Sequence, residues 1–543
     1  MQVNHKKSFI KFGVNLTLCF TTGLTAFLSE SVLASKPKTV TIALTTEPPN
    51  LDSSKATDTE SFVIVGHTME GLTRYDQKGD IVPAVAESWE LTNTGVIFHL
   101  RKNARWSDGK PVEAKNFVYS WRRALDPKTA SEYAFILYAL KNGELINQGK
   151  LPLDQLGVVA KDANTLEVTF ERPCGYFLGL TSFATYFPLR EDFINKAKDK
   201  YASSPDTILS NGPFRLVNWV HGASLRLEKN KQYWNQASVQ IDAIDVPYIT
   251  PDATARFNLY KTEKIDMIQQ LSKENIANAQ REAFRLKKYA DGSLWYFMFN
   301  FREGKITSNK NLRMAIRSVL NRTEFISRAV GIPGTLPGLG LIPSWMKGEA
   351  QAFRKEFPLP PEKQNIALAK EYLSKAMKEL GLTSPPSISY LTDDTEGAIR
   401  TAEYLQGLFK TTLGIDLKID KQIFKQRLAK QKSGDFEISM AGWGPDYNDP
   451  MTFADLFTSW NGNNTGKWVN KNFDQHIRNA MNTVDQKVRM SEMAAAEKLL
   501  LDDVAIIPTY ERTIMYTHRS KIQGVARRPV GLDPDFTAAR IEE

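Results

Sequence analysis

Residues 387–420, SISYLTDDTEGAIRTAEYLQGLFKTTLGIDLKID, place a long helical pattern between two short apolar segments. The first segment, SISYLT (387–392), and the last, IDLKID (415–420), alternate apolar and polar residues as strands do. The residues between them, through FKTTLG (409–414), predict a helix. A strand, a helix and a second strand in this order predict a β-α-β unit, which is typical of α/β proteins.

Strands and helices alternate on both sides of this unit as well. FEISMAGW (436–443) predicts a further strand, and the apolar run SLWYFMFNF (293–301) predicts a strand that is covered on both faces. TLEVTFERP (165–173) is typical of an edge strand that ends at Pro173. NLRMAIRSVLNRTEFISRAV (311–330) predicts a helix by its 3.6-residue spacing. We therefore expect an α/β fold with at least two lobes.

The composition is that of a globular protein with a moderate positive charge. The 543 residues include 42% hydrophobic and 24% charged residues, with a formal net charge of +9. No run of Lys and Arg alternates with aromatic residues, so we expect no nucleic-acid partner. A basic surface that docks on an anionic membrane or an acidic partner stays open, beside a merely solvated surface.

The N-terminus has the pattern of an export signal. Lys6, Lys7 and Lys11 precede a mostly apolar run over 12–28, and Val32 and Ala34 occupy the positions that signal peptidase reads. We expect a signal peptide over 1–34 that is cleaved after Ala34. An N-terminal membrane anchor is the weaker alternative, because polar residues interrupt the run.

No catalytic or metal-binding pattern occurs in the sequence. The six histidines are scattered, HExxH and GxSxG are absent, and GNNTGK (462–467) lacks the spacing of a phosphate loop. Only Cys174 remains after the predicted cleavage, so no intramolecular disulfide is expected. We expect no enzyme activity, no metal and no cofactor, although carboxylates alone do not exclude an exported hydrolase.

The loop AGWGPDYNDPMTF (441–453) combines turn-forming residues with a large aromatic side chain. Asp446 in such a loop can cap a turn. It can also face a ligand, and the loop by itself favours the turn.

Three long blocks resemble one known family. They are AESWELTNTGVIFHLRKNARWSDGKPVEAKNFVYSWRRALDPKTASEYA (86–134), NGPFRLVNWVHGASLRLEKNKQYWN (211–235), and the loop at 441–453 followed by NGNNTG (461–466). In order and spacing they resemble the extracellular solute-binding proteins of peptide ABC importers, family 5, and most of all its oligopeptide-binding members.

The resemblance implies a periplasmic-binding-protein type II clamshell, in which two lobes are built from three domains with mixed sheets. Domain I would comprise 35–69, 190–293 and 514–543, domain II 70–189, and domain III 294–513. The chain would cross between the lobes near residues 293 and 514. A periplasmic monomer that carries oligopeptides to an inner-membrane ABC permease is the implied function.

The resemblance also assigns roles in the opening loop. Asp446 would hold the α-ammonium group of the peptide, since an ammonium removed from water needs a carboxylate partner. Gly442 and Gly444 would let the peptide backbone approach and pair as an added strand. Trp443 would form the wall of a side-chain pocket. Core packing is the alternative for Trp443.

Other segments contribute further expected ligand contacts. Asn463 would hydrogen-bond the ligand backbone, Tyr133 would line the cleft from domain II, and Thr59 stands where the N-terminal segment of the family pairs with the peptide. Tyr296 is the member of its aromatic strand that we expect to face a ligand. A turn residue is the alternative for Asn463, and packing is the alternative for Tyr133.

The sequence departs from the family where the carboxyl end of the peptide is held. Enteric oligopeptide-binding members carry an Arg and a His at positions that are Met440 and Ala398 here, and a further Arg aligns near Lys430. The cationic grip on this end is therefore weaker or relocated, which favours longer peptides or ligands that are not clamped there. A murein peptide, glutathione, haem or nickel stays open as the ligand of the same fold.

Overall fold

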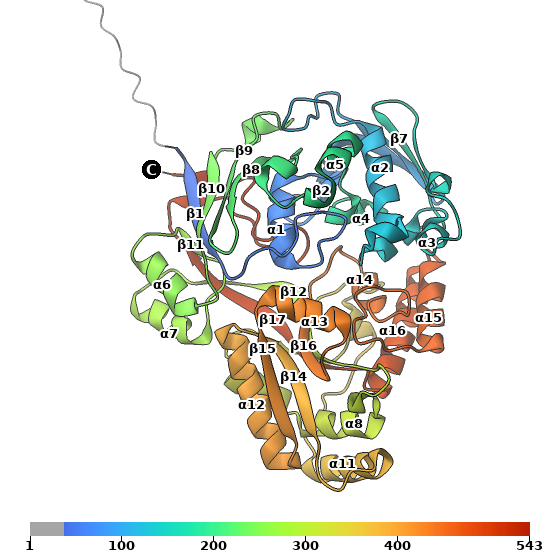
Figure 1. Cartoon of the computed structure of the whole chain (residues 1–543), viewed down its shortest axis with the longest axis vertical. Helices are drawn as coiled ribbons and strands as arrows, with labels where there is room; N and C mark the ends of the chain where they lie inside the picture. The colour runs from blue at the N-terminus through green and yellow to red at the C-terminus, as the bar shows by residue number, and fades with distance from the viewer. Residues whose placement is uncertain (1–36, 543) are drawn as a thin grey trace, which may run out of the picture. The chain divides into compact units, whose positions relative to one another are not determined.

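One long mixed β-sheet runs through the described part of the chain, residues 37–542 of the computed structural model (Figure 1). Residues 38–542 belong to one compact unit, and the predicted signal peptide, 1–34, lies outside the described residues. The strands of the sheet, in spatial order, are β15 (Asp416–Gln422), β14 (Ser387–Asp393), β16 (Ile438–Trp443), β12 (Lys287–Phe299), β17 (Ile506–His518), β11 (Met267–Ile268), β1 (Thr39–Leu44), β10 (Ala243–Ile249), β9 (Ser224–Lys229) and β8 (Phe214–Val220). The short β13 (Leu336–Pro337) pairs with β17.

Smaller sheets accompany the long one. The strands of these sheets are β4 (Ala86–Leu91), β5 (Gly95–Leu100), β7 (Thr165–Thr169) and β6 (Val158–Ala160), the pair β2 (Thr73–Tyr75) and β3 (Ile81–Pro83), and the pair β18 (Ile522–Gln523) and β19 (Arg540–Ile541). The helices are α1 (Thr59–Thr68), α2 (Ala114–Leu125), α3 (Gly143–Asn147), α4 (Phe177–Leu180), α5 (Glu191–Ala197), α6 (Ala253–Lys261), α7 (Lys273–Arg281), α8 (Lys310–Val319), α9 (Arg322–Phe325), α10 (Phe353–Glu356), α11 (Ile366–Leu380), α12 (Glu396–Leu413), α13 (Phe424–Ser433), α14 (Met451–Ala454), α15 (Lys471–Met481) and α16 (Gln486–Asp502).

The β-α-β unit predicted over 387–420 is confirmed. Strands β14 and β15 pair in parallel over their whole length, and α12 connects them. Thr395 caps the start of α12 by accepting a hydrogen bond from the backbone N–H of Ala398. The helix ends at Gly414, whose φ of 71° is left-handed and favours glycine. Local sequence signals therefore determine both ends of this helix.

Strands β12 and β17 join the two parts of the long sheet. Both have 13 residues, and they pair antiparallel from Lys287↔Tyr516 to Met298↔Ile506. Strand β12 pairs with β16 and strand β17 with β11, so this pair connects the β14–β16 region to the β1–β10 region. The crossings expected near 293 and 514 fall within these two strands, and the domain boundaries stay predictions.

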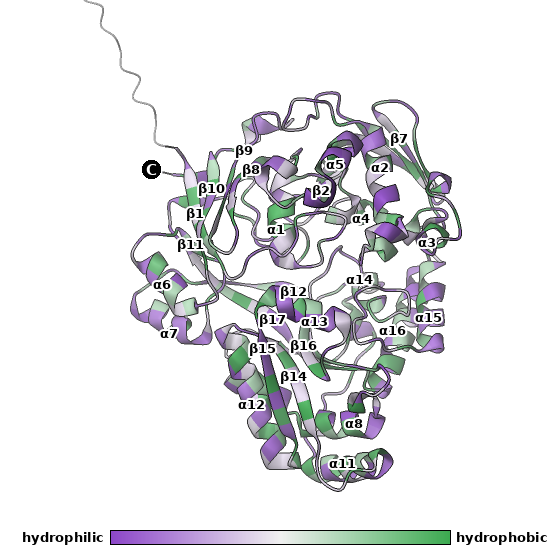
Figure 2. Ribbon diagram, viewed as in Figure 1, coloured by the Kyte–Doolittle hydropathy of each residue, from purple (hydrophilic) through white to green (hydrophobic). Residues whose placement is uncertain are grey.

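The apolar strand 293–301 is buried on both faces, as predicted. Leu294, Phe297 and Phe299 are at most 1% exposed, and Tyr296 and Met298 are at most 4% exposed. Figure 2 shows the helices that cover the sheet with both hydrophilic and hydrophobic colours, as amphipathic helices have. Within residues 37–542, no helix combines the length and apolar character needed to cross a bilayer.

Two details differ from the sequence-based expectations. The strand at 165–169 is not an edge strand, because β7 lies between β5 and β6. The single helix expected over 311–330 is interrupted: α8 ends at Val319, and Asn321 starts α9 by accepting a hydrogen bond from the N–H of Glu324. An Asn side chain favours such a cap over the interior of a helix. A π-helical turn over Ile326–Val330 completes this segment.

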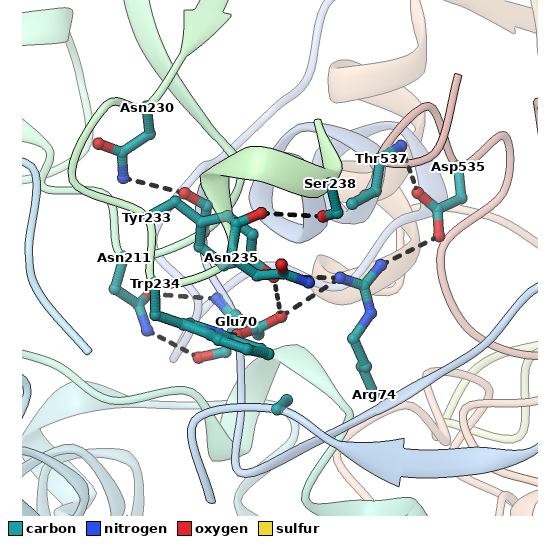
Figure 3. Close-up of polar contacts among 12 residues, drawn as sticks. Glu70, Arg74, Asn211, Asn230, Tyr233, Trp234, Asn235, Ser238, Asp535 and Thr537 are labelled. Atoms are coloured by element: carbon teal, nitrogen blue, oxygen red, sulfur yellow. Dashed lines mark hydrogen bonds and ion pairs between the residues drawn. The ribbon is translucent and has the colours of Figure 1, made fainter. Parts of the chain in front are cut away.

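A buried polar cluster ties together segments that are distant in the sequence (Figure 3). The Glu70 carboxylate accepts hydrogen bonds from the Tyr233 hydroxyl at 2.6 Å, from the Trp234 indole N–H at 2.7 Å and from Arg74 at 3.3 Å. The Arg74 guanidinium also contacts Asp535 at 3.5 Å. Glu70 exposes only 3% of its surface, so these donors take the place of water around its charge. The cluster holds the C-terminal segment on the β2 region.

We predict that Glu70→Ala lowers the free energy of unfolding by about 3–5 kcal/mol, because the Tyr233 hydroxyl and the Trp234 indole N–H then lose their acceptor and Arg74 keeps only Asp535 as a carboxylate partner. Urea unfolding of the whole chain measures the change. The matched control is Glu90→Ala, which removes an exposed carboxylate paired with His99 and should change the free energy by no more than about 0.5 kcal/mol. Equal effects of the two substitutions would contradict this role of Glu70.

Candidate functional site

A cavity of about 830 Å³ lies along the ends of the central strands. Its lining includes β16 and the loop that follows it, the first turns of α1 and α12, and residues of α6 and α13. This volume is in the range of ligand-binding cavities. The segments 132–133 and 182–187 close it from the α2 side of the chain.

Strand β16 presents an unpaired backbone edge to the cavity. One edge pairs with β12 from Ile438 to Trp443, whereas pairing with β14 on the other edge stops at Ser439. From Met440 onward this second edge has no backbone partner among the described residues, and residues 440–446 all line the cavity. Such an edge can accept an additional extended chain by main-chain hydrogen bonds.

The Asp446 carboxyl group lies at the end of this edge. Its Oδ1 accepts a hydrogen bond from the Tyr133 hydroxyl at 3.2 Å, and its backbone N–H donates to the Thr452 hydroxyl at 3.0 Å. The Trp443 indole N–H donates to the Thr452 carbonyl at 2.9 Å. Thr452 at the start of α14 thus fixes both the acidic and the aromatic residue of the loop.

The electrostatic environment of Asp446 is unfavourable to its negative charge. Burial raises the pKa of Asp446 well above its ordinary value; the hydrogen bond from Tyr133 opposes this shift, and the Asp455 carboxylate adds to it. Burial, followed by repulsion from Asp449, also raises the pKa of Asp455, to about 8. The described residues include no cation within 4.0 Å of the Asp446 carboxylate, and no cation contributes to its pKa shift. A cationic group placed in the cavity would relieve this unfavourable environment.

Aromatic side chains surround the carboxyl group. The ring of Tyr133 stacks on that of Trp443 at 6.1 Å and packs against Phe183 at 4.9 Å. Phe62 of α1 contacts both Phe183 and Tyr133, at 4.9 and 5.9 Å between ring centroids. Tyr133 is 2% exposed, whereas Trp443 is half-buried and borders the cavity. The sequence-predicted Tyr133, Trp443 and Asp446 therefore lie together, although residues 133 and 446 are far apart in the chain.

Gly442 and Gly444 have different surroundings. Gly442 lies opposite Trp295, and a Cβ atom at this position would approach the Trp295 ring to 2.6 Å. A Cβ atom at Gly444 would have no neighbour within 4 Å. Gly442 is therefore required by packing inside the sheet, and Gly444 leaves open space in the cavity.

Asn463 and Thr59 also line the cavity. The side-chain Nδ2 of Asn463 is buried without a hydrogen-bond partner among the described residues. Thr59 is the first residue of α1, and the residue before it, Asp58, is extended with φ −133° and ψ 155°. Strand-like pairing in this segment can therefore involve Asp58 and the residues before it, because Thr59 itself is helical.

The three departures from the family pattern have distinct positions. Met440 and Ala398 line the cavity and bring no charge to it. The Lys430 ammonium is paired with Asp420 at 2.5 Å and with Asp435 at 3.0 Å, outside the lining. Lys430 is therefore engaged elsewhere.

Several lining residues gave no signal in the sequence. Phe62, Phe183 and Trp295 come from separate segments, and only the folded chain brings them to one cavity. Tyr296, the expected ligand-facing member of its strand, lines the cavity and is 4% exposed. Cys174 is buried, and burial raises the pKa of its thiol to about 12. Among residues 37–542, no group of three His, Cys, Asp or Glu side chains is placed to hold a metal ion.

Polar contacts connect the segments on the two sides of the cavity. The ammonium group of Lys432 contacts the Glu132 carboxylate at 2.7 Å, and Arg478 contacts Glu144 at 2.9 Å. The rings of Tyr176 and Tyr447 stack at 5.1 Å with 7° between their planes. These pairs join residues assigned to domain II with residues assigned to domain III.

The sequence pattern of the bacterial extracellular solute-binding proteins, family 5 Middle, matches residues 80–465. This range covers more than half of the chain. The chain belongs to this family of solute-binding proteins. The resemblance and the α/β fold expected from the sequence are confirmed.

Relatives and solved structures that match nearly the whole of this chain agree with the family assignment. The dipeptide-binding protein DppE of Bacillus subtilis is 32% identical, with 89% of each chain covered. A substrate-binding domain of an oligopeptide ABC transporter from Bacillus anthracis has a TM-score of 0.89 at 34% identity and covers 94% of this chain and 99% of its own. OppA of Listeria monocytogenes bound to peptide has a TM-score of 0.88 at 33% identity, with 94% and 100% covered.

Two structures of one relative distinguish conformations of the fold. The murein tripeptide-binding protein MppA of Escherichia coli, at 27% identity, has a TM-score of 0.85 in one structure and 0.63 in its unliganded open form. Both structures share at least 93% of this chain and 98% of their own. The family 5 protein described here therefore differs from the open arrangement, in agreement with the polar contacts across its cavity.

We predict that Gly442→Val destabilises the protein by about 1–3 kcal/mol, because the new side chain displaces the Trp295 ring. Gly444→Ala is the matched control and should leave the melting temperature unchanged, because its Cβ atom meets no other atom. Thermal unfolding of both variants without added ligand measures the difference. If Gly442→Val melts like the wild type, the packing of Trp295 over Gly442 is not a constraint.

Proposed function

We propose that this family 5 protein captures oligopeptides in the cavity between two lobes and delivers them to an ABC permease of the inner membrane. The single observation that carries the proposal is the Asp446 carboxyl group at the end of an unpaired strand edge. A free peptide presents a cationic amino terminus followed by an extended backbone, so it complements both features in the correct order.

The carboxyl group provides the site for the amino terminus. An α-ammonium group enclosed by Phe62, Tyr133 and Phe183 loses its water, and the ionised Asp446 replaces that hydration by a charge-assisted hydrogen bond. The same contact favours the ionised form of Asp446, which burial alone disfavours.

The strand edge provides affinity that is independent of peptide sequence. Main-chain hydrogen bonds from Met440–Gly444 are available to any extended chain, and the open space beside Gly444 admits the peptide backbone. The unpartnered Nδ2 of Asn463 is a further donor for the ligand backbone once a small side-chain movement exposes it. Thr59 and Trp443 border the same space.

Transport rather than catalysis follows from the same features. The relatives named above are binding proteins, and the proposed role is capture without turnover. The proposed location is the periplasm, after cleavage of the signal peptide behind Ala34, and the proposed state is a monomer. The domain I, II and III boundaries given above describe the proposed lobes.

We predict that Asp446→Asn weakens binding of a free pentapeptide by about 100-fold or more, because removing one partner of a buried ion pair costs about 3–5 kcal/mol. Isothermal titration calorimetry measures the affinity. The N-acetylated peptide should bind the wild type as weakly as the free peptide binds the variant, and the two changes together should add little.

The control for this test is Asp394→Asn, which removes a carboxylate that lines the same cavity. It should change the affinity by less than about threefold, and Asp446→Asn should retain the wild-type melting temperature because asparagine can still accept the Tyr133 hydrogen bond. Native mass spectrometry of the purified protein should show a series of co-purified peptides. If a single murein peptide, glutathione, haem or nickel co-purifies instead, that compound is the ligand. If the protein hydrolyses a bound peptide, it is a hydrolase rather than a transport receptor.

We predict that peptide binding releases protons and that the affinity rises as the pH rises through the pKa of Asp446. In the unliganded arrangement that the structure shows, with Tyr133 on Asp446, the raised pKa favours the protonated carboxyl group, whereas the bound ammonium requires the carboxylate, so a peptide that enters this arrangement expels a proton. Calorimetry in buffers with different ionisation enthalpies measures this release. The share due to Asp446 disappears in Asp446→Asn, while any share from Asp455 remains; equal proton release by both proteins would contradict the assignment.

A further inference from the structure

Six arginines are buried in the described part of the chain, and one of them has no carboxylate partner. Five of them form ion pairs: Arg190, Arg313, Arg322, Arg489 and Arg528. Arg256 alone forms no ion pair within 4.0 Å among residues 37–542, although only 9% of its surface is exposed. A buried cation without a partner is unfavourable for stability, so its presence points to a partner from outside the chain.

The surroundings of Arg256 direct its free donors into the cavity. Arg256 lies in α6, and its Nη1 donates to the backbone carbonyl of Thr250. Its other N–H groups have no hydrogen-bond partner among residues 37–542, they are not sealed off from solvent, and the side chain lines the cavity. Those groups are therefore accessible from the cavity. Burial lowers the pKa of Arg256, and the carboxylates of Glu60, Glu396 and Asp252 partly offset this at a distance.

The other arginines of this part of the cavity are already paired. Arg400 contacts Glu274 at 2.6 Å, Arg427 contacts Asp393 at 3.0 Å, and Arg512 contacts Asp291 at 2.5 Å. Lys273 donates to the backbone carbonyls of Ser327 and Arg328. Lys55 and Lys425 also line the cavity and form no ion pair within 4.0 Å in the described part of the chain, but both are exposed. Among the described lining residues, Arg256 is therefore the buried cation without a carboxylate partner.

The N-terminus of α12 borders the same part of the cavity. This helix has 18 residues, and its first turn, including Glu396 and Gly397, lines the cavity. The backbone N–H groups of a helix N-terminus favour an anion. Glu396 weakens this preference, so the argument rests on Arg256, and the helix is a second, smaller contribution.

Arg256 and Asp446 approach the cavity from different sides. Figure 1 shows α6 on the side of β11, at the left, and α14, which follows Asp446 by a few residues, on the other side of the central strands. An extended ligand anchored at Asp446 therefore runs along the edge of β16 toward the region of α12 and α6. Its negative end has no cation at Met440, Ala398 or Lys430.

We propose that Arg256 binds a carboxylate of the ligand, at the end opposite to the amino group held by Asp446. This inference rests on the proposed function, because it concerns the same bound peptide. The carboxylate is the C-terminal one in peptides that end at Arg256 and an Asp or Glu side chain in longer ones. Arg256 thereby supplies the positive charge for the ligand carboxylate that this chain lacks at Met440 and Ala398.

The test is a calorimetric comparison of peptides with and without carboxylates. A set of peptides of three to eight residues is titrated into the wild type and Arg256→Gln, each as free acid, as C-terminal amide, and with an internal Glu replaced by Gln. For the length that reaches Arg256, we expect the wild type to prefer the carboxylate by about 10- to 100-fold. Arg256→Gln should lose this preference and bind the amide as the wild type does.

The matched control is Arg400→Gln, which removes a cavity arginine that is already paired with Glu274. It should leave the ratio of free acid to amide unchanged, whatever its effect on overall affinity. An unchanged preference in Arg256→Gln, or no preference in the wild type at any length, would overturn the proposal. Absence of peptide binding altogether would instead refute the proposed function, so the two failures are distinguishable.

Thermal unfolding without ligand separates a binding role from a structural one. Arg256→Gln should melt at the wild-type temperature or above, since it removes an unpaired buried charge. Arg489→Gln, which breaks the pair with Asp449, should melt lower. A large loss of melting temperature in Arg256→Gln would show that this arginine supports the fold and would contradict its role as a free ligand contact.

Discussion

A half-buried carboxyl group without a cationic partner is shifted toward its protonated form, and a positive partner removes that penalty; the proposed site of this family 5 protein depends on this constraint. Asp446 has aromatic rings and a second acidic residue around it, and Tyr133 is its hydrogen-bond donor. The chain places Thr452, Trp443 and the end of β16 so that this group stays in the cavity. In the proposed function, a ligand amino group is the partner that completes it.

Elsewhere the chain neutralises its buried charges internally. Glu70 has three donors, and Asp535 lies between the guanidinium groups of Arg74 and Arg528. Burial acts to raise the pKa of Asp535, and these two cations more than offset it, so the pKa lies below its ordinary value. Asp446 and Arg256 differ from these groups, because among the described residues neither has an oppositely charged partner within 4.0 Å. Both border the cavity. Unpaired charges lower the stability of the protein, and they occur here at positions that can contact a ligand.

Local patterns predicted the β-α-β unit and the doubly covered strand, because helix caps and apolar runs act over a few residues. The internal position of β7 was missed because its partner β6 has three residues and no recognisable pattern. Similarity to a family, rather than spacing, predicted Asp446 and Tyr133 at one site. Arg256 carried no signal, since its lack of a partner depends on which acidic residues of distant segments fold next to it.

The contacts that span the cavity are too weak to hold it closed by themselves. The pairs Glu132–Lys432 and Glu144–Arg478 are partly exposed, and pairs of this kind contribute about 0–1 kcal/mol each. A ligand changes the populations of the open and closed arrangements only to the extent that its affinities for the two arrangements differ. A peptide that supplies a cation to Asp446 has such a difference, because Tyr133 and the loop of Asp446 come from opposite sides and enclose the charge only when they meet. On the proposed function, the unfavourable charge in the cavity is therefore what couples ligand capture to closure.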